Sequence, residues 1–243
     1  MQFTPKTKLA DIIHINYLLL PIFNRFGIQL GFGDKTVEET CRENDINAEF
    51  FLVIINSFHD HNYFPQDKLQ RFDLNLIIDY IKKSHSYYLD IKVPQIEQLI
   101  QNFSSKSDDT FKDQIRLIEK FFTEYKEELI AHIKEEENKI FPYIITIGRS
   151  YAEGQVNEAH KSLIQANSIN KFASEHSNIE DKLFDLKNII IKYLHPVKDN
   201  FTSNALLIEL FRLELDLNDH ARIEDKVLIP KVQYIEKEIL RMV

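Results

Sequence analysis

The chain has 243 residues, of which 44% are hydrophobic and 28% charged, and its formal net charge is −8. Five glycines, seven prolines and one cysteine exclude a disulfide framework and favour long helices over a turn-rich β fold. The negative charge argues against nucleic-acid binding, and no run of about 18 apolar residues predicts a membrane span. Because the N-terminus also lacks a signal-peptide pattern, we expect a cytoplasmic protein that binds neither nucleic acid nor membranes.

Residues 1–62 predict a small helical domain. The first helix is expected over residues 9–26, interrupted or restarted at Pro21, because proline cannot continue a helical hydrogen-bond ladder. A loop with three glycines follows it at residues 27–35. Two further short helices are expected before the domain ends.

Capping residues mark the starts of those two helices. Thr36 and Glu39 form a capping-box pattern, which predicts a helix that extends to about Asn44. Asn47 can cap the next helix, because its side chain can accept a backbone N–H of the first turn. The polar residues 63–72, which include a proline, then predict a linker.

Residues 73–243 predict a bundle of four long helices. Apolar residues recur along each segment at alternating steps of three and four, which is the pattern of a helix face turned to a shared core. Short connections favour an up-down-up-down arrangement. The helices are expected at about 73–103, 110–147, 152–194 and 203–240.

A histidine interrupts the apolar seam in every one of these helices. In the second and fourth helices a glutamate follows four residues later, which places both side chains on one face. These two motifs also share a proline ten residues after the histidine, so the bundle reads as two repeated hairpins. The six polar seam residues are His85, His132, His176 and His220, with Glu136 and Glu224.

Six polar side chains at one level of an apolar core indicate a metal site. A buried carboxylate or imidazole without a partner costs several kcal/mol, and metal ions would use the lone pairs. Four imidazoles and two carboxylates suit two ions of iron, zinc, copper or manganese, and the ligand types do not choose among these. A ferritin-like site is disfavoured, since no histidine has glutamate three residues before it. Glu175 and Glu180 are expected to flank the site or face solvent, and Glu135 and Glu137, the neighbours of Glu136 in its acidic run, are expected to face solvent.

The repeated motif resembles the hemerythrin-like cation-binding family, and within it the di-iron proteins that repair iron–sulfur centres. The resemblance rests on HxxxE followed by Phe-Pro at 132–142, on its second copy at 220–230, and on the pair Glu175-His176. Residues 23–39 also have the layout of that family's N-terminal segment. The resemblance covers nearly the whole chain and implies an all-α fold, with a small helical domain before a hemerythrin-like four-helix bundle.

The resemblance also implies a cofactor and a function. The cofactor would be two non-haem iron ions with an oxo or hydroxo bridge, and the function would be repair of, or iron donation to, iron–sulfur clusters damaged by nitrosative or oxidative stress. The expected partners are iron–sulfur proteins or the small ligands nitric oxide and dioxygen, and a homodimer is left open. By resemblance the metal ligands are His85, His132, His176 and His220, with Glu136 and Glu224 as bridging carboxylates.

One departure from the family pattern concerns the N-terminal loop. The family's adjacent cysteine pair is replaced by Gly31 and Phe32, and the single cysteine, Cys41, stands on the next predicted helix. A role that needs two neighbouring thiols is therefore not carried over. Two alternatives to repair stay open: a module that binds or senses dioxygen or nitric oxide, and a structural or interaction bundle that holds zinc. No general base stands out, so an ordinary hydrolase is disfavoured.

Overall fold

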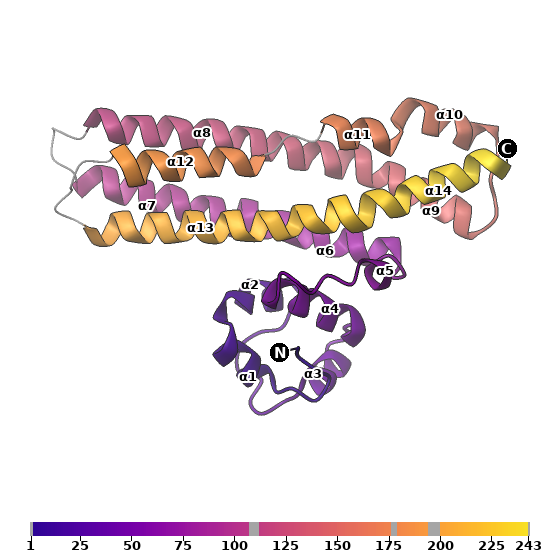
Figure 1. The fold of residues 1–243 in the computed structure, drawn as a ribbon, viewed down its shortest axis with the longest axis horizontal. Coiled ribbons are helices and arrows are strands. Elements are labelled where there is room, and N and C mark those ends of the chain that lie inside the picture. Colours follow the sequence, from indigo (N-terminus) through magenta and orange to yellow (C-terminus); the bar gives the residue numbers. More distant parts are fainter. Residues whose placement is uncertain (1, 107–111, 176–178, 194–199, 243) are drawn as a thin grey trace. The chain divides into compact units, whose positions relative to one another are not determined.

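The computed structural model describes residues 2–106, 112–175, 179–193 and 200–242 (Figure 1). Contacts divide the chain into two units. One comprises Met1–Ser84 with Lys226–Leu228, and the other comprises His85–Asp225 with Ile229–Val243. The predicted boundaries at 62 and 73 stay predictions. In the described ranges, no helix has both the length and the apolar character needed to cross a bilayer.

The first unit contains short helices. The first break falls at Asn16 rather than at Pro21, because Asn16 is extended and its side chain accepts the N–H of Leu18 at 3.1 Å. Pro21 instead lies in the first turn of a helix, where its missing N–H is not needed. The predicted linker contains a helical turn whose Leu69 is buried. The elements are α1 (Leu9–Ile15), η1 (Tyr17–Leu19), α2 (Leu20–Arg25), α3 (Val37–Glu43), α4 (Ala48–His59) and α5 (Gln66–Leu69).

The predicted caps of α3 and α4 are confirmed. Thr36 and Glu39 each accept the other's backbone N–H in a capping box, and the Asn47 side chain accepts the N–H of Phe50 at 2.9 Å. The core of this unit combines aliphatic side chains with aromatic rings. The ring of Phe51 meets that of Phe23 edge-on, with centroids 5.5 Å apart.

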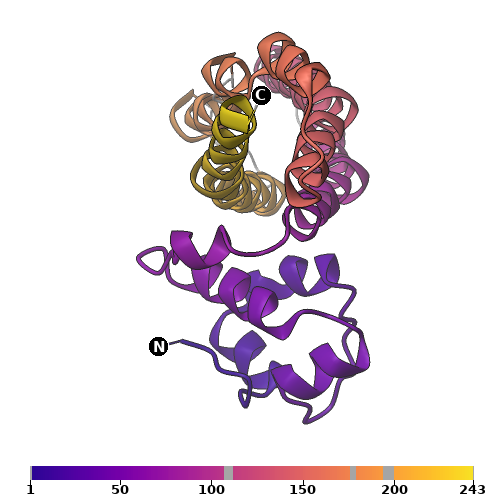
Figure 2. The ribbon, with the colours of Figure 1, turned by 90° about the vertical axis from the view of Figure 1, so that its right-hand side faces the viewer.

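The second unit is built around four long helices. Helix α7 contacts α8, α8 contacts α12, α12 contacts α13, and α13 returns to α7, which closes an up-down-up-down ring (Figures 1 and 2). The all-α fold is confirmed. The elements from residue 74 onward are α6 (Leu74–Tyr87), η2 (Tyr88–Lys92), α7 (Val93–Lys106), α8 (Lys112–Glu135), η4 (Glu136–Ile140), α9 (Phe141–Ala152), α10 (Glu158–Asn167), α11 (Ile169–Glu175), α12 (Ile179–Tyr193), α13 (Asn200–Ile223), η5 (Glu224–Leu228) and α14 (Ile229–Met242).

The prediction of one continuous helix over 152–194 is wrong. Asn157 accepts the backbone N–H groups of the next helix's first turn and starts α10, and the hydroxyl of Ser168 accepts the N–H of Asn170 at the start of α11. Side chains of this kind compete with the helical ladder, which the apolar spacing does not reveal. The preceding helix also passes Gly148 and ends at Ala152, ahead of Gly154 with its φ of 65°.

Three of these elements, η2, η4 and η5, are π turns. In η4 the N–H of Phe141 donates to the carbonyl of Glu136, five residues back. This extra residue shifts the buried stripe: Phe141 is buried, whereas Ile140 is only half-buried. In an uninterrupted α-helix, Ile140 would continue the buried stripe, because it lies four residues after Glu136.

Candidate metal centre

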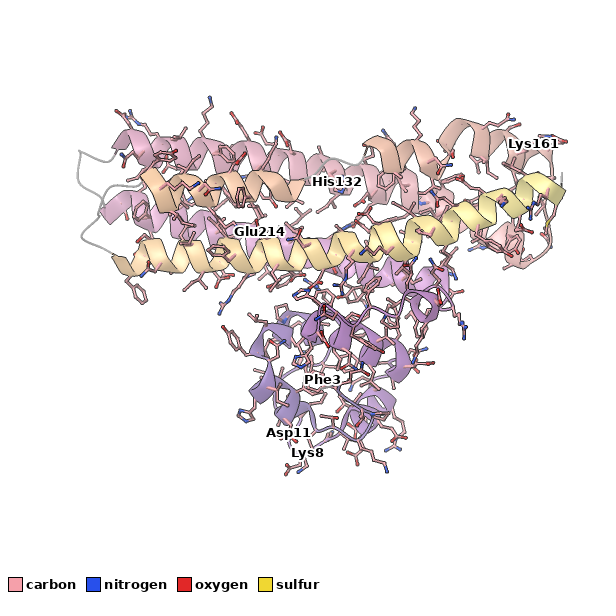
Figure 3. All side chains as sticks on the ribbon, viewed as in Figure 1. Phe3, Lys8, Asp11, His132, Lys161 and Glu214 are labelled. Atoms are coloured by element: carbon pink, nitrogen blue, oxygen red, sulfur yellow. The ribbon has the colours of Figure 1, made fainter. Side chains whose placement is uncertain are left out.

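Five of the six predicted site residues lie together within the second unit. His85 stands near the end of α6, His132 near the end of α8 and His220 near the end of α13. Glu136 and Glu224 are the first residues of the π turns η4 and η5. Their seam positions bury all of them except the His132 side chain, which is 17% exposed. Figure 3 shows His132 partway along the bundle.

Donor atoms from three helices form one connected set. The Oε1 atom of Glu136 lies 3.3 Å from Nε2 of His132, and its Oε2 atom lies 3.3 Å from Nε2 of His85. That nitrogen is 3.2 Å from Nε2 of His220, which in turn is 3.1 Å from Oε1 of Glu224. Glu136 thus spans histidines of two helices, as a bridging carboxylate would.

The sixth predicted residue, His176, lies outside the described residues. The same holds for the side chains of its neighbours Glu175 and Glu180. The role of each of the six residues as a ligand therefore stays a prediction, while the meeting of five of them is a property of the fold.

The chemistry and spacing of the donors fit a metal cation. The ligand atoms of His85, His220 and Glu224 all lie within 4.8 Å of one another, and all three residues are buried. Two donors bound to one ion at about 2.1 Å are at most about 4.2 Å apart, so small movements complete coordination. The buried Nδ1 of His220 has no hydrogen-bond partner among the described residues, so it does not hold that ring in place.

A carboxylate that the sequence analysis placed in solvent contacts the site. Glu137 lies next to Glu136, and its Oε1 accepts a hydrogen bond from Nδ1 of His85 at 3.0 Å. The ring of Phe141 stacks on the same imidazole at 5.8 Å. Such a carboxylate fixes the histidine tautomer and leaves Nε2 facing the metal position. Helical spacing gave no signal for this contact, because Glu137 reaches His85 from within a π turn.

The carboxylates also control the charge of His85. Burial by itself lowers the pKa of this imidazole, but the neighbouring Glu136, Glu224 and Glu137 outweigh it, so the pKa is raised. Without a cation, these glutamates therefore favour the protonated form of His85. Metal binding would replace that proton, because a ligating imidazole must be neutral.

A tyrosine that the sequence did not single out positions His220. Tyr88 is fully buried, and its ring meets the imidazole of His220 edge-on at 5.5 Å. Its hydroxyl donates to Oδ1 of Asp216 at 2.9 Å, one turn before His220. The contact limits the orientations open to the His220 ring.

The fold and the site define a four-helix bundle that gathers histidine and glutamate around a cation position. The chain matches the Hemerythrin HHE cation binding domain over residues 76–232, and it belongs to that family. Among curated proteins, it is similar to the iron-sulfur cluster repair protein ScdA of Staphylococcus haemolyticus (strain JCSC1435). The two are 19% identical over 231 residues, which cover 95% of this chain and 99% of that protein.

Proposed function

We propose that this protein holds two iron ions and repairs, or donates iron to, iron–sulfur clusters damaged by nitrosative or oxidative stress. The observation that carries the proposal is the buried His–Glu set in a chain that aligns with a repair protein along nearly its whole length. The alignment reaches beyond the residues of the cation-binding domain, so the N-terminal unit is included in the similarity.

In this proposal each residue has a separate task. His85, His132, His176 and His220 would supply nitrogen donors, and Glu136 and Glu224 would bridge the two ions. A bound iron pair would supply redox chemistry and open positions for small ligands. Glu137 keeps the Nε2 atom of His85 directed at the metal, and Tyr88 holds the ring of His220.

Binding or sensing of nitric oxide or dioxygen is the second candidate, and the lone cysteine favours it. Gly31 and Phe32 stand where the family has its cysteine pair. Cys41 is 1% exposed, and burial raises the pKa of its thiol to about 11, so the thiolate is suppressed at neutral pH. Repair by this chain would therefore have to proceed without thiol chemistry.

A repair assay separates the two candidates. Wild type, Cys41→Ser and His132→Ala, each first assayed for iron content, are added to an iron–sulfur enzyme damaged by nitric oxide, and the recovered activity is measured. We expect recovery with wild type and Cys41→Ser and loss with His132→Ala. Absence of recovery with iron-loaded wild type that still binds nitric oxide would favour sensing. Equal recovery with His132→Ala would contradict a role of the metal centre.

A further inference from the structure

Each of the three π turns in the described residues is followed by a proline at the same distance. Pro94, Pro142 and Pro230 lie six residues after the first residue of η2, η4 and η5. In each case the residue before the proline donates its N–H to the carbonyl five residues back. These bonds run from Val93 to Tyr88, from Phe141 to Glu136 and from Ile229 to Glu224.

The chemistry of proline explains this coincidence. Proline has no N–H, and in an α-helix its ring collides with the carbonyl four residues earlier. A π turn inserts one residue, which moves that carbonyl aside and lets the helix continue. At Pro230 the released carbonyl has found another donor, since the oxygen of Lys226 accepts Nε2 of Gln70 at 3.3 Å.

Two of the π turns begin at a predicted ligand, and the geometry at Glu136 shows the consequence. Consecutive residues of an α-helix point about 100° apart. Glu136 and Glu137 nevertheless reach the two nitrogens of one ring, Nε2 of His85 at 3.3 Å and Nδ1 at 3.0 Å. Phe141, five residues after Glu136, stacks on that same ring. The turn therefore brings three residues of one helix around a single imidazole.

We propose that Pro142 and Pro230 are positioning residues of the metal centre. Each enforces the π turn that begins at a ligand glutamate. The turn at Pro142 directs Glu136, Glu137 and Phe141 at His85. The turn at Pro230 begins at Glu224, directly after the helical turn that places this carboxylate beside His220. Neither proline is a predicted ligand. The inference rests on the proposed function only for the identity of the bound ion. The link between proline and π turn is a property of the helix and holds whichever ion is bound.

Alanine substitutions test this role through two readouts. In Pro142→Ala and Pro230→Ala the turn can relax to an α-helix, in which alanine is the most favourable residue. We expect the metal-free variants to melt at or above the wild-type temperature. Anaerobic iron(II) titration should show affinity reduced about 10- to 100-fold, the usual effect of losing support for a ligand. A proline needed only for folding would instead lower the melting temperature.

Two other prolines serve as matched controls. Pro94→Ala alters a π turn that begins at Tyr88 rather than at a predicted ligand, so we expect a smaller loss of iron affinity. Pro21→Ala changes an ordinary helix start in the first unit and should leave affinity unchanged. Wild-type iron affinity in both Pro142→Ala and Pro230→Ala would overturn the proposal.

Different results would contradict this inference and the proposed function. Wild type that binds no iron would contradict the proposed function alone. A crystal structure of Pro142→Ala then decides the inference. A straight α-helix with Glu137 turned away from His85 supports it, and a persisting π turn overturns it.

Discussion

The N-terminal unit and the bundle bury polar groups in two different ways. In the first unit, buried Asn56 is paired with the backbone of Phe3, accepting its N–H at 2.7 Å and donating to its carbonyl at 3.0 Å. At the metal centre of the bundle, the buried polar groups are imidazoles and carboxylates that converge within a few ångströms, whereas buried Lys92 elsewhere in the bundle pairs with Glu209. Neutral amide and backbone groups satisfy each other, whereas converging ligands need a cation or a proton. The bundle should therefore depend on metal, and the first unit should not.

The largest expected effect is loss of the metal itself. Replacing both Glu136 and Glu224 by alanine removes the two predicted bridges, so metal analysis should fall from about two ions per chain to none. Amide hydrogen exchange in the first unit should stay unchanged. Glu135→Ala is the control, because this exposed neighbour pairs with Lys139. Two ions retained in the double variant would contradict the bridging assignment.

Removal of the metal by chelation should lower the stability of the bundle and leave that of the first unit unchanged. A ligand that binds only the folded state at 100 times its Kd adds about 2.7 kcal/mol to the free energy of unfolding. Metal removal should thus lower the melting temperature and speed amide exchange in the bundle alone. Unchanged melting after verified metal removal would favour a purely structural bundle.

Glu137→Gln should weaken the site without dismantling it. The amide keeps the shape of the side chain but loses the charge that orients His85, so calorimetric titration should show metal affinity reduced about 10- to 100-fold. Glu135→Gln, which removes the same charge one residue earlier, should bind as wild type does. Equal affinities would mean that the contact with His85 has no role in binding.

Cys41 gives the first unit a pH dependence of its own. Because the thiol pKa is raised to about 11 in the folded protein, the unfolded chain loses this proton first as pH rises. Stability contributed by the neutral thiol is present below about pH 9 and lost as pH rises toward 11, by up to about 2.7 kcal/mol. Unfolding of Cys41→Ala across pH 8 to 11 should lack this slope, and an identical slope would assign it to other groups.

The smallest expected effect comes from a helix cap in the first unit. Asn47→Ala removes the hydrogen bond to the N–H of Phe50 and should cost about 1 kcal/mol. Denaturant unfolding measures this cost, and iron content should not change. Asn47→Ser, which retains a capping oxygen, should recover most of the stability. A loss of iron in Asn47→Ala would show that the two units are coupled.

The sequence by itself determined the helical fold and the seam residues that meet in the bundle. Helical periodicity is local, so the spacing of His132 and Glu136 placed both on one face without knowledge of the partner helices. The caps at Thr36 and Asn47 were predictable for the same reason, since each depends on a residue three positions away.

Only the tertiary structure decided which side chains contact and position the predicted ligand histidines. The contact between Glu137 and His85 joins residues 52 positions apart, and the Tyr88 hydroxyl meets Asp216 across 128 positions. The π turns were signalled by Pro142 and Pro230, but a proline can also kink or end a helix. Here the helix continues past the proline, and the inserted residue keeps Glu136 and Phe141 on one buried face.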